Sequence, residues 1–258
     1  MRKIIILLLL ISIKGFALSL NTEMTVELDS TLTREEGHQL NSAENELSIS
    51  IEKKFLEIFS LGPKVIFSSE MGKGSEPISR LHSLGPMASV GSSFFNDKLV
   101  VGLSYSYQFI QDNYLQNKYS LKGEHQTEAS ILYIFNPLFS TEIYGEFVKF
   151  AGGIPLYSAT SDYDYIYGIN LKFDFENFNM GQAFERNVSA QLNEFHKRSN
   201  KVYDRWHFIS YVGTSVYGID AEVSAILYPL RNNYYKTFAK DTFKVFDIGL
   251  NISKKLEF

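Results

Sequence analysis

The chain has 258 residues, no cysteine, a formal net charge of −4 and an aromatic share of 15%. The lack of cysteine excludes disulfides, zinc–thiolate sites and a lipid anchor on an N-terminal cysteine. A mean hydropathy of −0.11 is far too polar for a bundle of membrane-spanning helices. The sequence also has no basic stripe that could neutralise nucleic-acid phosphates, so we expect no nucleic-acid partner.

The N-terminus has the three parts of a secretory signal peptide. The second and third residues are basic, an apolar run follows, and the small residues Ala17 and Ser19 come after it. A run of about ten apolar residues is too short to cross roughly 30 Å of hydrocarbon, which disfavours a membrane anchor. We therefore predict cleavage after Ala17 or Ser19, with a signal peptide over 1–19 and one domain over 20–258.

The rest of the chain consists of segments in which apolar and polar residues alternate. Successive side chains of a β-strand point to opposite faces, so each segment is expected to form a strand with one apolar and one polar face. In chain order these segments span residues 23–29, 47–51, 65–67, 86–94, 99–109, 129–135, 139–147, 162–175, 186–195, 206 onward, 219–227 and 246–258. We predict an all-β protein of about twelve strands, with ten as the alternative.

The connections between these strands alternate in length. Tight turns are predicted at 60–63, 95–98, 136–137, 176–179 and 215–218. Long polar connections are predicted at 33–44, 72–82, 111–124, 151–161, 196–204 and 231–241. A bacterial barrel with both ends in the periplasm needs an even number of strands, short periplasmic turns and longer outer loops. A soluble β-sandwich has no reason to sort its connections in this way, so the pattern favours an antiparallel up-and-down transmembrane barrel.

Aromatic residues are predicted to lie near both ends of the strands. In segment 162–175, three tyrosines lie near the outer end and two phenylalanines near the inner end, with aliphatic residues between them. Segment 99–109 places two tyrosines and Phe109 at the outer end as well. Two aromatic rims around an aliphatic band resemble the girdles of transmembrane β-barrels.

The final strand carries a resemblance to a known class of proteins. Its apolar face, interrupted only by Lys254, consists of Phe246, Ile248, Leu250, Ile252, Leu256 and Phe258. An alternating last strand that ends in phenylalanine resembles the C-terminal signal of Gram-negative outer-membrane β-barrels, which the barrel-assembly machinery recognises. The resemblance implies an outer-membrane location, with membrane lipid and that machinery as partners. The architecture is similar to that of the small twelve-stranded monomeric porins, which implies a monomer.

The strand face predicted to point into the bore is acidic. The residues predicted to line the pore are Glu128, Glu142, Glu146, Asp162, Asp164, Lys172, Asp220, Glu222 and Asp247. Other inward bases are fewer than the inward acids, and they are Lys54, Lys64, Arg205 and Lys255. An acidic, water-filled bore concentrates cations and repels anions. We therefore predict a narrow channel for passive diffusion of small solutes with a weak cation preference. The alternative is a non-conducting structural barrel plugged by its own paired charges.

The solute is less constrained than the architecture. Small porins for acidic oligosaccharides are expected to line their bore with Arg and Lys, and this sequence does not. Tyr144, Tyr211 and Tyr228, if they point inward, either stack against neutral sugars or fill space.

An outer-membrane lipid or peptide hydrolase is the competing class. Such an enzyme needs a histidine near a serine, or paired acids, at the outer rim. The candidates near that rim are Asp162, Asp164, His125 and His196, with His207 inward or close to it. The sequence has no Gly-x-Ser-x-Gly elbow and no His-Glu-x-x-His motif. We therefore predict no catalytic residues, no metal site and no cofactor.

Overall fold

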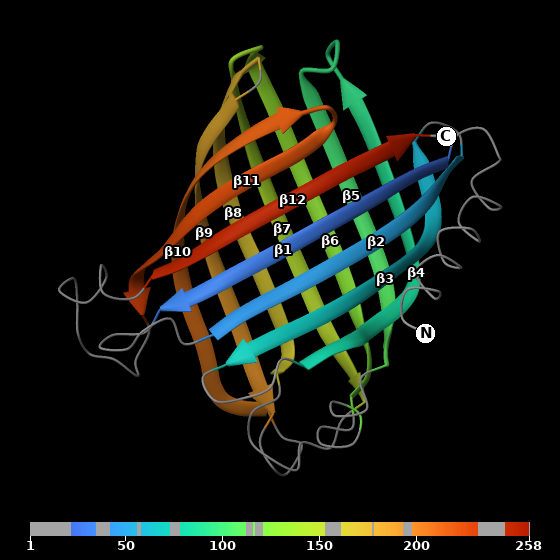
Figure 1. Ribbon diagram of the computed structural model, residues 1–258, viewed down its shortest axis with the longest axis vertical. Helices are drawn as coiled ribbons and strands as arrows, with labels where there is room; N and C mark the ends of the chain where they lie inside the picture. Colours follow the sequence, from blue (N-terminus) through green and yellow to red (C-terminus); the bar gives the residue numbers. More distant parts are fainter. Residues whose placement is uncertain are drawn as a thin grey trace.

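The computed structural model is a closed barrel of twelve antiparallel strands in which each strand pairs with its neighbours in the chain (Figure 1). It describes residues 22–34, 42–55, 58–72, 78–111, 116, 121–152, 161–176, 178–192, 198–231 and 246–257. The strands are β1 (Thr22–Arg34), β2 (Ser42–Phe55), β3 (Phe59–Gly72), β4 (Ile78–Phe94), β5 (Leu99–Ile110), β6 (Leu121–Asn136), β7 (Phe139–Gly152), β8 (Ser161–Phe175), β9 (Phe178–Leu192), β10 (Arg198–Val216), β11 (Ile219–Arg231) and β12 (Phe246–Glu257). Within these ranges, no helix is long and apolar enough to cross a membrane.

The first and last strands close the barrel. They pair from Glu23 opposite Glu257 to Arg34 opposite Phe246, and their ribbons lie side by side at the front of Figure 1. A closed barrel leaves no strand edge to pair with another molecule. The predicted fold class is therefore confirmed, with twelve strands rather than ten. The predicted signal peptide lies outside the described residues.

The predicted C-terminal signal falls on β12. Ile248 and Leu250 are 39% and 37% exposed on its outer face. Phe246, Ile252 and Leu256 also belong to β12, whereas Phe258 lies outside the described residues. Recognition of this strand by an assembly machinery stays a prediction.

Many strands are longer than the alternation indicated. β6 begins at Leu121 and β10 at Arg198, so the long connections before them are shorter than predicted. Hydropathy alternates only where one face is apolar, whereas backbone pairing continues beyond that zone. β9 begins at Phe178 and not at 186 as predicted. The exposed Gln182 interrupts the apolar series on its outer face, so the alternation did not reveal the first half of this strand.

The predicted turn at 60–63 is wrong. β2 ends at Phe55 and β3 begins at Phe59, so Gly62 and Pro63 lie inside β3. Pro63 stands opposite Pro86 of β4, and a proline contributes no backbone N–H to the ladder. The Gly-Pro pair therefore marks an irregular place within a strand instead of a connection. The other four predicted turns lie at or next to observed connections between strands.

The outer wall of the barrel is apolar at mid-height. Ile143 is 58% exposed, Val223 54%, Leu103 48% and Ile131 47%. A contiguous apolar surface of this extent would cause aggregation in water, but it is what a wall in contact with lipid requires.

Aromatic rings flank the apolar band at both ends, as predicted. Near the short turns, centroid distances of 4.7, 5.1 and 5.0 Å join, in order, the rings of Tyr133, Phe135, Phe139 and Phe173. Toward the loop end, distances of 6.1, 6.1 and 6.0 Å join the rings of Phe147, Tyr163, Tyr165 and Tyr167. Each row crosses neighbouring strands, so the rims agree between strands.

Candidate functional site

The candidate site is the polar inner wall of the barrel. Most of the predicted pore-lining residues lie on the strand face opposite the exposed apolar side chains, and they are Glu128, Glu142, Glu146, Asp164, Lys172, Asp220, Glu222 and Asp247. Asp162 belongs to β8, but its side chain lies outside the described residues. Their role in lining an open passage stays a prediction.

Two inward glutamates share one neutral partner at mid-height. Glu128 of β6 and Glu146 of β7 stand opposite each other in the strand register. The Gln126 amide Nε2 donates a hydrogen bond of 2.9 Å to a carboxylate oxygen of each. An amide satisfies the lone pairs of a carboxylate without neutralising its charge. The pair therefore adds negative charge to the bore.

The wall formed by β1 and β12 repeats this arrangement. Asn251 of β12 donates from Nδ2 to Glu27 Oε1 and to Asp29 Oδ1 of β1, both at 2.6 Å. Glu222 of β11 lies opposite Asn251 on its other side. One asparagine is thus surrounded by carboxylates from two neighbouring strands.

Lysines pair with acids closer to the short turns. Glu23 accepts from Lys54 at 2.8 Å and from Lys255 at 2.6 Å, and Lys172 pairs with Asp174 at 2.9 Å. These pairs neutralise charge at one end of the bore and leave the middle acidic.

Lys64 of β3 is the exception in the middle of the bore. Its ammonium group interacts electrostatically with Glu46 of β2, Glu124 of β6 and Glu146 of β7. The charges of Glu46 and Glu124, on well-separated strands, also interact with each other. The charge of one lysine therefore acts on acids from three separate strands.

Two inward tyrosines brace the wall formed by β7 to β10. Tyr144 of β7 lies over Gly168 of β8 and donates its hydroxyl to Glu185 of β9 at 2.9 Å. Tyr211 of β10 lies over Gly181 of β9 and donates to Asn170 of β8 at 2.9 Å. Each ring spans a strand whose glycine leaves room for it. Both tyrosines point inward, and their hydroxyls are engaged with the wall. For these two residues the arrangement supports the space-filling alternative over sugar stacking, whereas the side chain of Tyr228 lies outside the described residues.

This bracing predicts that Gly181→Ala destabilises the barrel. The new methyl group would overlap the ring of Tyr211, which is only 7% exposed, and the backbone carbonyl oxygen of Leu171 in β8. Overpacking of this kind costs about 1–3 kcal/mol. Urea unfolding midpoints measure the effect. Gly145→Ala is the matched control, because its methyl group would meet its nearest neighbour, Ile166 O, at an ordinary 3.6 Å. Equal midpoints for the two variants would contradict the bracing role.

Those residues proposed for an enzyme site whose side chains the structure describes do not come together. His125 accepts from or donates to the Tyr105 hydroxyl at 2.8 Å, and its ring packs on Tyr107 on the outer face. Asp164 lies on the inner face, and His207 points inward, 2.9 Å from Glu185. His196 lies outside the described residues. Within the described ranges, no three His, Cys, Asp or Glu side chains are grouped as metal ligands.

Some inner-wall residues escaped the sequence interpretation. Glu185 precedes the predicted start of the ninth strand at 186, so its face was not assigned. Gln126 likewise precedes the predicted sixth strand at 129. Asn251 was on the predicted polar face, but the acids beside it on β1 and β11 became known only from the strand register.

The architecture matches that of solved outer-membrane channels. An outer-membrane channel from Pseudomonas putida F1 superposes with a TM-score of 0.68 at 11% identity, covering 93% of this chain and 97% of that chain. The fold is that of an outer-membrane channel. The KdgM porin in complex with disordered oligogalacturonate superposes with a TM-score of 0.52 at 9% identity, covering 89% of this chain and 98% of the porin chain. No protein-family model matches the sequence, and no curated protein matches it.

Proposed function

We propose that the chain is a non-enzymatic outer-membrane channel for passive diffusion of small solutes, with a preference for cations. The observation that carries this proposal is the charge of the bore. Apart from Lys64, its middle carries carboxylates held by neutral amides, while lysine–carboxylate pairs lie toward the short turns. Such a bore raises the local concentration of cations and lowers that of anions.

The outer wall supports placement in the membrane. An aliphatic band between two aromatic rows fits a hydrocarbon core with its two interfaces. Short turns then face the periplasm, and the long connections face outward. The same placement requires export, which is consistent with removal of residues 1–19 and with assembly through the C-terminal strand.

The solute is expected to differ from that of the KdgM porin. That porin is described in complex with oligogalacturonate, which is a chain of acidic sugars. A bore with paired carboxylates at Glu128 and Glu146 repels a polyanion. Neutral and cationic solutes are favoured instead.

A planar bilayer tests the function and the preference together. Under a KCl gradient, the reversal potential should have the sign of cation preference. The preference should weaken as the salt rises from 0.1 M to 1 M, because the Debye length falls from about 10 Å to about 3 Å. A folded, inserted protein that passes no current contradicts the channel, and a reversal potential of anion sign contradicts the charge argument.

A further inference from the structure

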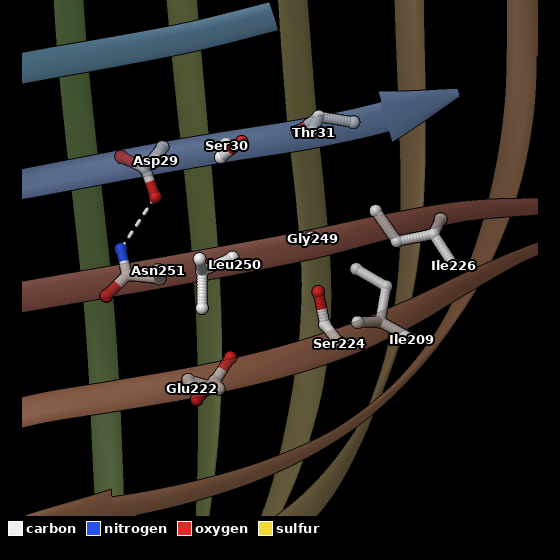
Figure 2. A pocket seen from close by; sticks show the side chains of 10 residues that line it. All are labelled: Asp29, Ser30, Thr31, Ile209, Glu222, Ser224, Ile226, Gly249, Leu250 and Asn251. Atoms are coloured by element: carbon white, nitrogen blue, oxygen red, sulfur yellow. Dashed lines mark hydrogen bonds between the residues drawn. The ribbon is translucent and has the colours of Figure 1, made fainter. Parts of the chain in front are cut away.

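A hollow of about 450 Å³ lies in the inner wall formed by β1, β12, β11 and β10 (Figure 2). Gly249 lies at its centre, opposite Thr31 of β1 on one side and Ser224 of β11 on the other. Because a Cβ at Gly249 would overlap the Ser224 hydroxyl, the missing side chain leaves this space. Sites for small organic molecules measure roughly 300–1,000 Å³, and the hollow falls in that range.

One end of the hollow is acidic. Asp29 and Glu222 stand on either side of Asn251, and Figure 2 shows the three side chains together at this end. Asp29 accepts from the Asn251 amide. The Glu222 carboxylate has no hydrogen bond or salt bridge with any residue that the structure describes, although its charge interacts with that of Lys172 of β8 and with that of Asp29. None of the ten lining residues is basic, so the charge disfavours an anionic occupant.

The other end is apolar. Ile209 of β10 and Ile226 of β11 are paired in the strand register and line the hollow together (Figure 2). A hydrocarbon group bound against these two side chains would remove their surface from water. The favourable free energy of binding would be proportional to the apolar area buried.

The spacing of the two acids disfavours a bare metal ion. Asp29 and Glu222 are separated by one intervening strand, which places them roughly 10 Å apart at about 5 Å per strand. A calcium ion needs its oxygen ligands at about 2.3–2.6 Å, so the two acids are too far apart to hold one together in this arrangement.

We propose that this hollow binds an organic cation, with its ammonium group between Asp29 and Glu222 and a short hydrocarbon body against Ile209 and Ile226. An organic cation would then be a solute class of the proposed channel. This inference rests on the proposed function only in that the solute would travel through the bore. The hollow combines an acidic end, an apolar end and room for a small organic molecule. An organic cation is complementary to all three features.

Equilibrium binding tests this site without current measurement. The probe is benzyltrimethylammonium, added to the purified full-length barrel in a non-ionic detergent and followed by isothermal titration calorimetry. Benzoate, benzyl alcohol and tetramethylammonium are the comparison probes for charge, neutrality and loss of the hydrocarbon body. We expect benzyltrimethylammonium to bind at least about fivefold more tightly than benzoate and benzyl alcohol, as loss of an ion pair of about 1 kcal/mol implies. Tetramethylammonium should also bind more weakly, because it lacks the hydrocarbon that would be buried against Ile209 and Ile226.

Two variants fill the hollow, a third removes a charge beside it, and a fourth serves as a matched control. Gly249→Leu and Thr31→Leu should each weaken binding about tenfold, equivalent to about 1.4 kcal/mol. Glu222→Gln should weaken it about fivefold through loss of one charge. Gly91→Leu adds the same side chain to the inner face of β4, outside the hollow, and should change binding less than about twofold. A heat-dependent gel shift verifies that each variant is folded.

The outcomes separate this site from the channel. No binding of benzyltrimethylammonium, equal binding of benzoate, or unchanged binding in folded Gly249→Leu or Thr31→Leu overturns the organic-cation site. If binding is absent but the bilayer conducts, the channel remains and this site falls. If binding follows the expected order but the bilayer does not conduct, the site remains and the channel falls.

Discussion

Glu128→Gln combined with Glu146→Gln should remove most of the cation preference of the channel. Both carboxylates accept from the same Gln126 amide, and glutamine retains an acceptor oxygen at each position. Two unit charges about 4 Å apart interact by about 1 kcal/mol in water, so each lost charge lowers the local cation concentration by up to about fivefold. The reversal potential in a KCl gradient measures the change.

Lys64→Gln should shift the same measurement in the opposite direction. Lys64 interacts electrostatically with Glu46, Glu124 and Glu146, so its removal leaves those acids less compensated.

Glu176→Gln is the control for the double glutamate variant, because it removes one negative charge from an exposed turn outside the strands. If Glu176→Gln shifts the reversal potential as much as the double variant does, the preference arises from general surface charge instead of the bore.

The barrel itself could be predicted because its physical requirements repeat along the chain. Each strand needs an apolar outer face and a polar inner face, and a period of two is visible without knowledge of the partner strand. Segments 99–109 and 162–175 showed this most clearly, and β5 and β8 match them within two residues. The aromatic rims could be predicted for the same reason. Tyrosine and phenylalanine are favoured at certain depths in the membrane, and the depth of a residue follows from its position along the strand.

The strand ends and the Gly-Pro pair could not be predicted in the same way. Near the loop end both strand faces are polar, so hydropathy no longer distinguishes a strand from a loop. Gly62-Pro63 has the composition of a turn, and only pairing with Pro86 of β4 places it within a strand.

The candidate site was predicted in charge but not in arrangement. Alternation assigned Glu128, Glu146 and Glu222 to the inner face. It could not show that Gln126 joins the first two, or that Gly249 opens a hollow next to the third, because both depend on which residues of other strands lie opposite. The register is the alignment of residues between two paired strands, and a single sequence determines it only weakly.

The Gly-Pro pairs of β3 and β4 share an unusual closeness to a neighbouring backbone. A Cβ at Gly62 would overlap the carbonyl oxygen of Ile51 in β2, and a Cβ at Gly85 would overlap that of Tyr107 in β5. A backbone oxygen cannot move aside without disturbing its strand. Gly85 therefore permits a close approach that a side chain would prevent.

Gly85→Ala should consequently cost more than about 3 kcal/mol, at the upper limit of what overpacking usually causes. We expect a lower urea unfolding midpoint and a loss of the heat-dependent gel shift of the folded barrel. Gly91→Ala is the matched control on the same strand and the same inner face, where the new methyl group would lie an ordinary 3.5 Å from Val101 O. Its free energy of unfolding should stay within about 0.5 kcal/mol of the wild-type value, as is usual for a substitution that creates no clash. Equal behaviour of the two variants would mean that β4 and β5 can separate at Tyr107 at little cost, so the close approach would not be required for the fold.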